Sequence, residues 1–104
     1  MSDFSDVTKA TLDDLKVFSE SVSLGELGTG WSLESLEREL ALPHGNVRVI
    51  REVTAAQVAC LMVYWVLPDG IELLNIHTVK AFRRCGLGRR MMVHLVRECE
   101  RLQL

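Results

Sequence analysis

The chain has 104 residues, of which 48% are hydrophobic and 25% charged, and it contains only two prolines. This length and composition fit a single folded domain over residues 1–104, and they exclude a multidomain protein and a wholly disordered one. Residues 1–79 carry twelve acidic against five basic side chains, whereas residues 80–104 carry seven basic against two acidic ones. A positive segment this short favours a compact anion as ligand over a nucleic acid, which needs a broad positive face.

The apolar stretches are too short for a membrane protein. The longest uncharged apolar run, residues 58–67, is about half of the ~20 residues that a membrane-spanning helix needs. Asp3 and Asp6 near the start argue against a signal peptide. We therefore expect a cytoplasmic protein with reduced cysteines. No pair of cysteines or histidines has zinc-ligand spacing, so no metal site is expected.

The first part of the chain predicts a short strand and a helix. Residues 7–10 favour a brief opening strand. Thr11 and Asp14 have the spacing of a capping box, and apolar residues then recur at helical spacing, which predicts a helix from about residue 12 to residue 21. The glycine-rich residues 25–30 are interpreted as a flexible connection.

A second helix and three strands follow. Ser32 is a candidate helix cap, Trp31 and Leu36 have the spacing of a hydrophobic staple, and Pro43 ends the helix. The apolar pattern then predicts three strands in an antiparallel meander, at residues 47–53, 58–67 and 71–79.

The last predicted element is an amphipathic helix packed on the sheet. Its apolar positions recur every fourth residue at Leu87, Met91, Leu95 and Cys99, and we also expect Met92 in the core.

The segment that carries chemistry lies between the third predicted strand and this helix. Gly86 and Gly88 let the backbone turn its N–H groups toward a ligand, and the start of the helix adds unpaired donors and a positive dipole end. This arrangement suits a diphosphate. The segment lacks both the Walker pattern and the dinucleotide fingerprint. A glycine-permitted turn with a solvated basic face is the alternative.

Residues 83–88, Arg-Arg-Cys-Gly-Leu-Gly, match the Arg/Gln-x-x-Gly-x-Gly/Ala signature of the GNAT acyl-coenzyme A N-acyltransferases. The preceding Leu-Leu-Asn-Ile at residues 73–76 resembles the branch of ribosomal-protein-alanine N-acetyltransferases in particular. The resemblance covers nearly the whole chain and implies an α/β (α+β) fold. Its element order would be β-α-α-β-β-β-α, with a mixed, mostly antiparallel sheet.

The resemblance also implies a binding site for acetyl-coenzyme A. The pantetheine arm would lie along the backbone of Ile76, His77 and Thr78. The diphosphate would lie on the loop and helix start, where the implied residues are Arg84, Cys85, Gly86, Leu87, Gly88 and Arg89.

Glu72 is the candidate catalytic base, because transfer to an amine needs a group that takes a proton. It lies fourteen residues before Gly86, where the histone-acetylating branch of the superfamily carries its glutamate base. Burial among the neighbouring apolar residues would make this carboxylate a stronger base. A strand-end glutamate that faces water is an equally weighted alternative.

Later family elements have no counterpart in the chain, which stops after the third expected helix. The missing parts include the tyrosine that commonly protonates the departing thiolate, and Tyr64 does not match its position. The resemblance therefore implies a truncated N-acetyltransferase that acts on an amine, such as a protein N-terminus, by direct attack. The alternative is an impaired remnant that binds coenzyme A or a protein partner. We expect the unpaired strand at residues 71–79 to form a homodimer or larger assembly.

Overall fold

The computed structural model describes residues 3–21 and 31–104. Their elements are β1 (Thr8–Lys9), α1 (Leu12–Ser21), α3 (Leu33–Ala41), β2 (Gly45–Glu52), β3 (Gln57–Leu67), β4 (Gly70–Thr78), the short 3₁₀ helix η1 (Lys80–Phe82) and α4 (Leu87–Arg101). The order of these elements confirms the predicted α+β class. The predicted flexible connection at residues 25–30 lies outside the described residues.

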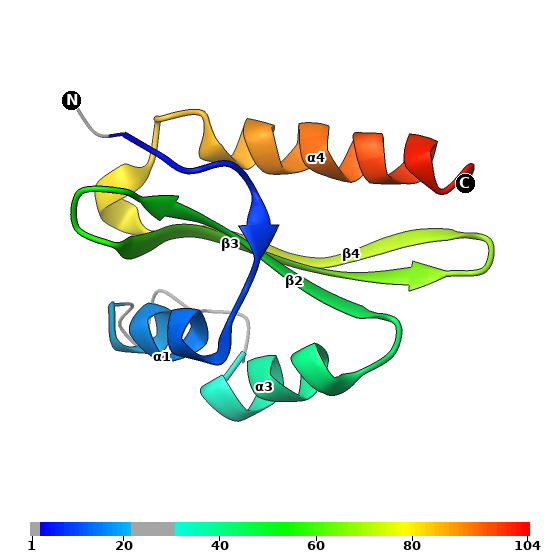
Figure 1. Ribbon diagram of the computed structural model, residues 1–104, viewed down its shortest axis with the longest axis horizontal. Helices are drawn as coiled ribbons and strands as arrows, with labels where there is room; N and C mark the ends of the chain where they lie inside the picture. Colours follow the sequence, from blue (N-terminus) through cyan, green and yellow to red (C-terminus); the bar gives the residue numbers. More distant parts are fainter. Residues whose placement is uncertain (1–2, 22–30) are drawn as a thin grey trace.

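The four strands form one sheet in the order β1-β2-β3-β4, and each neighbouring pair is antiparallel. The meander of β2, β3 and β4 is therefore confirmed. Figure 1 shows three layers, with α1 and α3 on one face of the sheet and α4 on the other. The parallel pairing implied by the term "mixed" does not occur among the described strands, because each connection between them reverses the chain direction.

Local sequence signals fix both N-terminal helices. The Thr11 backbone N–H donates to the Asp14 carboxylate, and the Asp14 N–H donates to the Thr11 hydroxyl, so the predicted capping box is present. The Ser32 hydroxyl accepts from the Ser35 N–H and caps α3 as predicted. Trp31 packs against the same core cluster as Leu36, as expected of a staple.

The core consists of two apolar clusters, one on each face of the sheet. The first lies under α1 and α3 and includes Leu15, Phe18, Leu36 and Leu61. The second lies under α4 and includes Met62, Leu87, Met91 and Leu95. The central strand β3 has side chains in both clusters, so its residues 58–64 are buried on both faces, which explains why the sequence there is almost continuously apolar.

The inner face of α4 is narrower than predicted. Leu87, Met91 and Leu95 are buried, as the spacing indicated, but Cys99 is half-buried. The prediction for Met92 was wrong, since this side chain is 41% exposed. Met92 follows Met91 by about 100° around the helix axis, which carries it off the face that contacts the sheet.

Two kinds of feature are absent from the described residues. No helix in the described part of the chain is long and apolar enough to cross a membrane. Within residues 3–21 and 31–104, no group of three or more His, Cys, Asp or Glu side chains is arranged to hold a metal ion.

Candidate functional site

Strand β4 is an edge strand, because no described strand pairs with its outer side. The Val79 N–H donates to the Ala59 carbonyl on β3 at 2.8 Å. This bond determines which residues of β4 direct their backbone groups toward β3. Backbone groups alternate sides along an antiparallel strand, so His77, which pairs with Leu61, also directs its N–H and C=O toward β3. Ile76 and Thr78 direct theirs toward the free edge. A ligand that pairs with this edge as a strand would therefore use Ile76 and Thr78.

The pairing of β4 contains a register shift just before these residues. Val63 pairs with Asn75, but the next residue, Tyr64, pairs with Leu73, so Leu74 is an extra residue on β4. A bulge of this kind bends the strand and increases its twist, and bulges are common beside active sites. The sequence contains no glycine or proline at this position that would have signalled the bulge.

The loop after β4 has a left-handed backbone at two positions. Arg84 and Gly86 both have positive φ, at 67° and 77°, on either side of Cys85. Gly86 is the left-handed residue from which α4 begins, and no side chain caps the first N–H groups of that helix. Helix starts of this kind leave backbone donors unpaired and place the positive end of the helix dipole beside them. The loop therefore has the left-handed glycine and the uncapped helix start on which the predicted anion cradle depends.

The space in front of this cradle is open. A Cβ atom added at Gly88 would meet no atom within 4 Å, and the same holds at Gly86. A Cβ at Gly88 would thus have room, in the first turn of α4 beside its uncapped N–H groups. A diphosphate fits this combination of exposed backbone donors, positive helix end and absent side chains.

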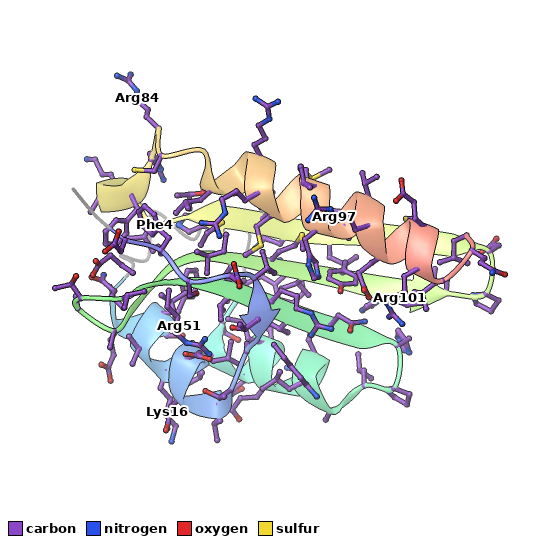
Figure 2. All side chains as sticks on the ribbon, turned by 45° about the horizontal axis from the view of Figure 1, so that its top comes forward. Phe4, Lys16, Arg51, Arg84, Arg97 and Arg101 are labelled. Carbon is purple, nitrogen blue, oxygen red and sulfur yellow. The ribbon has the colours of Figure 1, made fainter. Side chains whose placement is uncertain are left out.

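Arginines surround the loop in different roles. Arg84 and Arg89 are exposed, and Figure 2 shows Arg84 extended away from the body of the protein. Arg83 was not among the predicted site residues, yet its Nε donates to the Thr78 carbonyl at 3.2 Å, on the free edge of β4. Its place in the loop signature was the only sequence signal for this role. Arg90 instead donates to the Ser5 carbonyl at 2.8 Å and so links the N-terminal segment to α4.

Glu72 lies near the start of β4, opposite Trp65 on β3. It is exposed, so the expected burial is absent and the water-facing alternative describes its surroundings. The face that it shares with Trp65 is the α3 side of the sheet, because the Trp65 indole N–H donates to the Glu39 carboxylate of α3 at 2.8 Å. Glu72 is separated from the proposed ligand-pairing residues by the bulge at Leu74.

Two other residues discussed from the sequence pack against neighbouring elements. The His77 ring packs edge-on against Phe18 of α1, with ring centroids 5.7 Å apart, as expected of a packed histidine. Tyr64 is fully buried under α4, which fits the prediction that it does not take the position of the thiolate-protonating tyrosine.

Neither the known family models nor the curated proteins include a match to this chain. Solved structures do match. The ribosomal-protein-S18-alanine N-acetyltransferase from Escherichia coli superposes with a TM-score of 0.75 at 20% identity, over 95% of this chain and 61% of the enzyme. The chain has the GNAT acetyltransferase fold.

Further structures with the GNAT fold support the same conclusion. A GNAT-family acetyltransferase from Staphylococcus aureus Mu50 gives a TM-score of 0.73 at 13% identity, over 97% of this chain and 69% of that protein. Glucosamine-6-phosphate N-acetyltransferase from Arabidopsis thaliana gives 0.64 at 16% identity, over 96% and 76%. The chain thus spans less than two thirds of the Escherichia coli enzyme, and the likeness concerns the fold.

Proposed function

We propose that the protein is an acetyl-coenzyme A-dependent N-acetyltransferase that transfers an acetyl group to an amine by direct attack. The observation that carries this proposal is the position of the free β4 edge directly before the positive-φ loop at the start of α4. An edge strand suits an extended amide-containing arm, and the loop suits a diphosphate. Coenzyme A contains both groups in one molecule.

The proposed binding residues divide the cosubstrate into two parts. Ile76 and Thr78 would pair with the amides of the pantetheine arm, since their backbone groups face the free edge. The N–H groups of residues 84–89 would bind the diphosphate, with the exposed Arg84 and Arg89 side chains as charged partners. His77 would contribute through packing, because its backbone groups face β3.

When bound, acetyl-coenzyme A supplies an acetyl thioester. In direct transfer the neutral amine nitrogen attacks the carbonyl carbon, the carbon–sulfur bond breaks, and the sulfur leaves as a thiolate. The nitrogen loses one proton to a base, and the thiolate gains one. Glu72 is the proposed base, acting directly or through a water chain, since its exposed carboxylate is free to accept a proton from the solvent side.

The acceptor that we propose is the amine of a protein N-terminus, following the similarity to the alanine N-acetyltransferase structure. The three free thiols of the described residues, Cys60, Cys85 and Cys99, fit a reducing compartment, and we place the protein in the cytoplasm.

A second candidate function is binding of coenzyme A or of a protein partner without turnover. The observation that favours it is the burial of Tyr64, the only tyrosine in the sequence, which keeps its hydroxyl away from the proposed site. Tyr64 would then not serve as proton donor for the thiolate.

A calorimetric titration with acetyl-coenzyme A tests the cosubstrate site. We expect saturable binding by the wild-type chain and its loss in Gly88→Glu, whose carboxylate would enter the phosphate cradle. Gly70→Glu is the matched control, because a Cβ there also meets no atom within 4 Å but lies at the far end of β4. Absence of binding to a folded wild-type chain would overturn the proposal.

Turnover separates the two candidate functions. If the protein is an acetyltransferase, thiol release from acetyl-coenzyme A will depend on an added N-terminal peptide amine, and Glu72→Gln will lower kcat while leaving cosubstrate binding intact. Binding without amine-dependent thiol release would support the second function.

We also propose self-association through β4. No described strand pairs with its outer edge, and such an edge is a template for another strand. The Thr78 carbonyl on this edge accepts a hydrogen bond from Arg83, and a second chain would compete with the pantetheine arm for Ile76 and Thr78. Sedimentation at roughly tens of micromolar, a range that reveals weak association, should detect a dimer or larger species. A clean monomer would contradict this proposal.

A further inference from the structure

The outer side of α4 carries an apolar patch that no other described element covers. Met92, Val93 and Val96 are 41%, 41% and 54% exposed. Figure 1 shows α4 alone on its face of the sheet, with no described helix or strand outside it. An open hollow of about 340 Å³ runs along this patch, and its charged lining residues are Arg89, Arg97 and Glu100. Contiguous exposed apolar side chains with a charged rim are typical of an interaction surface.

The residues at the centre of this outer side are spaced like those of a contact between two helices. Arg89, Val93, Val96 and Glu100 follow one another at intervals of four, three and four residues. At 100° per residue they lie within roughly 60° of one another around the helix axis. Alternating intervals of three and four residues are those of helices that pack side by side. These four residues, called the outer seam below, have an apolar centre and one charge of each sign at the ends.

The outer seam is complementary to itself when two copies of α4 run antiparallel. A two-fold axis midway between Val93 and Val96 places Val93 beside Val96 of the partner subunit. Arg89 and Glu100 have the same midpoint in the sequence, so this axis also places Arg89 beside Glu100 of the partner subunit. A parallel pair of helices would instead bring like charges together at both ends, which is unfavourable. The order of charges therefore selects the antiparallel arrangement.

The charged ends of the outer seam are available for such pairs. Arg89 and Glu100 are both exposed, and neither forms a salt bridge within residues 3–21 and 31–104. Glu98 and Arg101, by contrast, already bind each other through hydrogen bonds of 2.8 and 3.0 Å. Arg97, which Figure 2 labels on α4, lies beside the seam, and its exposed side chain can stay in water. The two intermolecular pairs would thus replace no ion pair of the single chain.

We propose that the outer seam of α4 is an interface with a second copy of this chain, formed as an antiparallel helix pair about a two-fold axis. Val93 and Val96 supply the apolar centre, and the charge pairs at both ends set the orientation and the register. Since only three exposed apolar side chains of each copy take part, we expect a weak dimer.

This interface is independent of the association proposed for the edge of β4, because it uses the outer side of a helix. A chain that associates through both surfaces would build assemblies larger than a dimer. The α4 interface also does not depend on binding of a cosubstrate.

The first test is charge reversal at the two ends of the seam. Sedimentation is measured without acetyl-coenzyme A, which would compete for Arg89, at roughly ten to several hundred micromolar protein, a range that covers weak association. Arg89→Glu and Glu100→Arg each replace two attractive pairs with two repulsive ones, so each should weaken dimerisation at least about tenfold. An equimolar mixture of the two variants should restore it, because both attractive pairs form again in the mixed dimer.

The matched controls make the same changes of charge on α3. Arg38→Glu and Glu37→Arg alter exposed residues away from the seam, so each variant and their mixture should associate like the wild type. If the mixture of Arg89→Glu and Glu100→Arg stays as dissociated as its components, the antiparallel pairing is wrong.

The apolar centre gives a second, independent readout. Val96→Glu should abolish dimerisation through α4, whereas Val53→Glu should leave it unchanged, because Val53 is a valine of similar exposure, at 58%, in the turn after β2. Circular dichroism checks that each variant is folded. A wild-type chain that stays monomeric over the whole range would overturn the proposal. Association of equal strength in the wild type and in all variants would also overturn it, and would point to the β4 edge.

Discussion

Arg51 on β2 holds Asp14 of α1 through two hydrogen bonds, with Nε donating to one carboxylate oxygen at 2.9 Å and Nη2 to the other. The same carboxylate accepts the Thr11 N–H of the capping box. Burial would raise the pKa of Asp14, but the hydrogen bonds from Arg51 and Thr11 outweigh it, and the pKa lies below its ordinary value. One side chain thus starts a helix and joins it to the sheet.

Replacement of Asp14 by Asn should destabilise the protein by about 2 kcal/mol, because it weakens a cap and leaves Arg51 without its charged partner. The measurement is the free energy of unfolding in urea. The matched control is Asp13→Asn, which removes an exposed neighbouring charge and should cost well under about 1 kcal/mol. Equal losses in the two variants would contradict the role of the Arg51 contact.

The stability that Asp14 contributes should depend on pH. Since its folded-state pKa is lowered, the contribution is complete above the unfolded value of about 3.9 and is lost as the pH falls through the folded value. Urea unfolding at pH 7 and at pH 3 should therefore show the gap between wild type and Asp14→Asn shrinking at the lower pH. A gap that is constant over this range would count against the ion pair.

Gly45 should tolerate no side chain. A Cβ there would lie 2.3 Å from the Glu39 carbonyl oxygen and 3.1 Å from the Leu42 Cβ, because the end of α3 runs close to the start of β2. Gly45→Ala should cost about 1–3 kcal/mol, the range of overpacked sites. Gly70→Ala, where a Cβ meets no atom within 4 Å, is the control and should change the unfolding free energy little.

Substitution of Gly86 should also destabilise the protein, but for a different reason. Space is open around it, but its φ of 77° is left-handed, so Gly86→Ala should cost roughly 1 kcal/mol through backbone strain. Gly88→Ala has no such strain inside α4 and should leave stability equal or slightly higher. Comparison of the two thermal midpoints checks this, and an equal loss in both would point to a steric cause.

Substitution of the two adjacent methionines of α4 should change the stability of the protein by very different amounts. Met91 is fully buried against the sheet, so Met91→Ala should cost about 2–5 kcal/mol through lost packing and a residual cavity. Met92 is 41% exposed, and Met92→Ala should cost less than about 1 kcal/mol. Similar losses from both would mean that the outer face of α4 is covered.

Local sequence patterns predicted the features that depend on residues close together in the chain. The Thr11 and Asp14 spacing predicted the cap of α1, Ser32 predicted the cap of α3, and the apolar runs predicted the meander, because each signal acts within a few residues. Gly86 likewise predicted the left-handed turn before α4, since a residue without a Cβ adopts this conformation with little strain.

Contacts between segments that are distant in the chain depend on how whole elements pack together. The Asp14–Arg51 contact joins residues 37 positions apart, and no local pattern encodes such a pair. The bulge at Leu74 depends on the register with β3, and the exposure of Glu72 and Met92 depends on which faces the other layers cover. These features follow from the packing of whole elements, which the periodicity of a single segment does not specify.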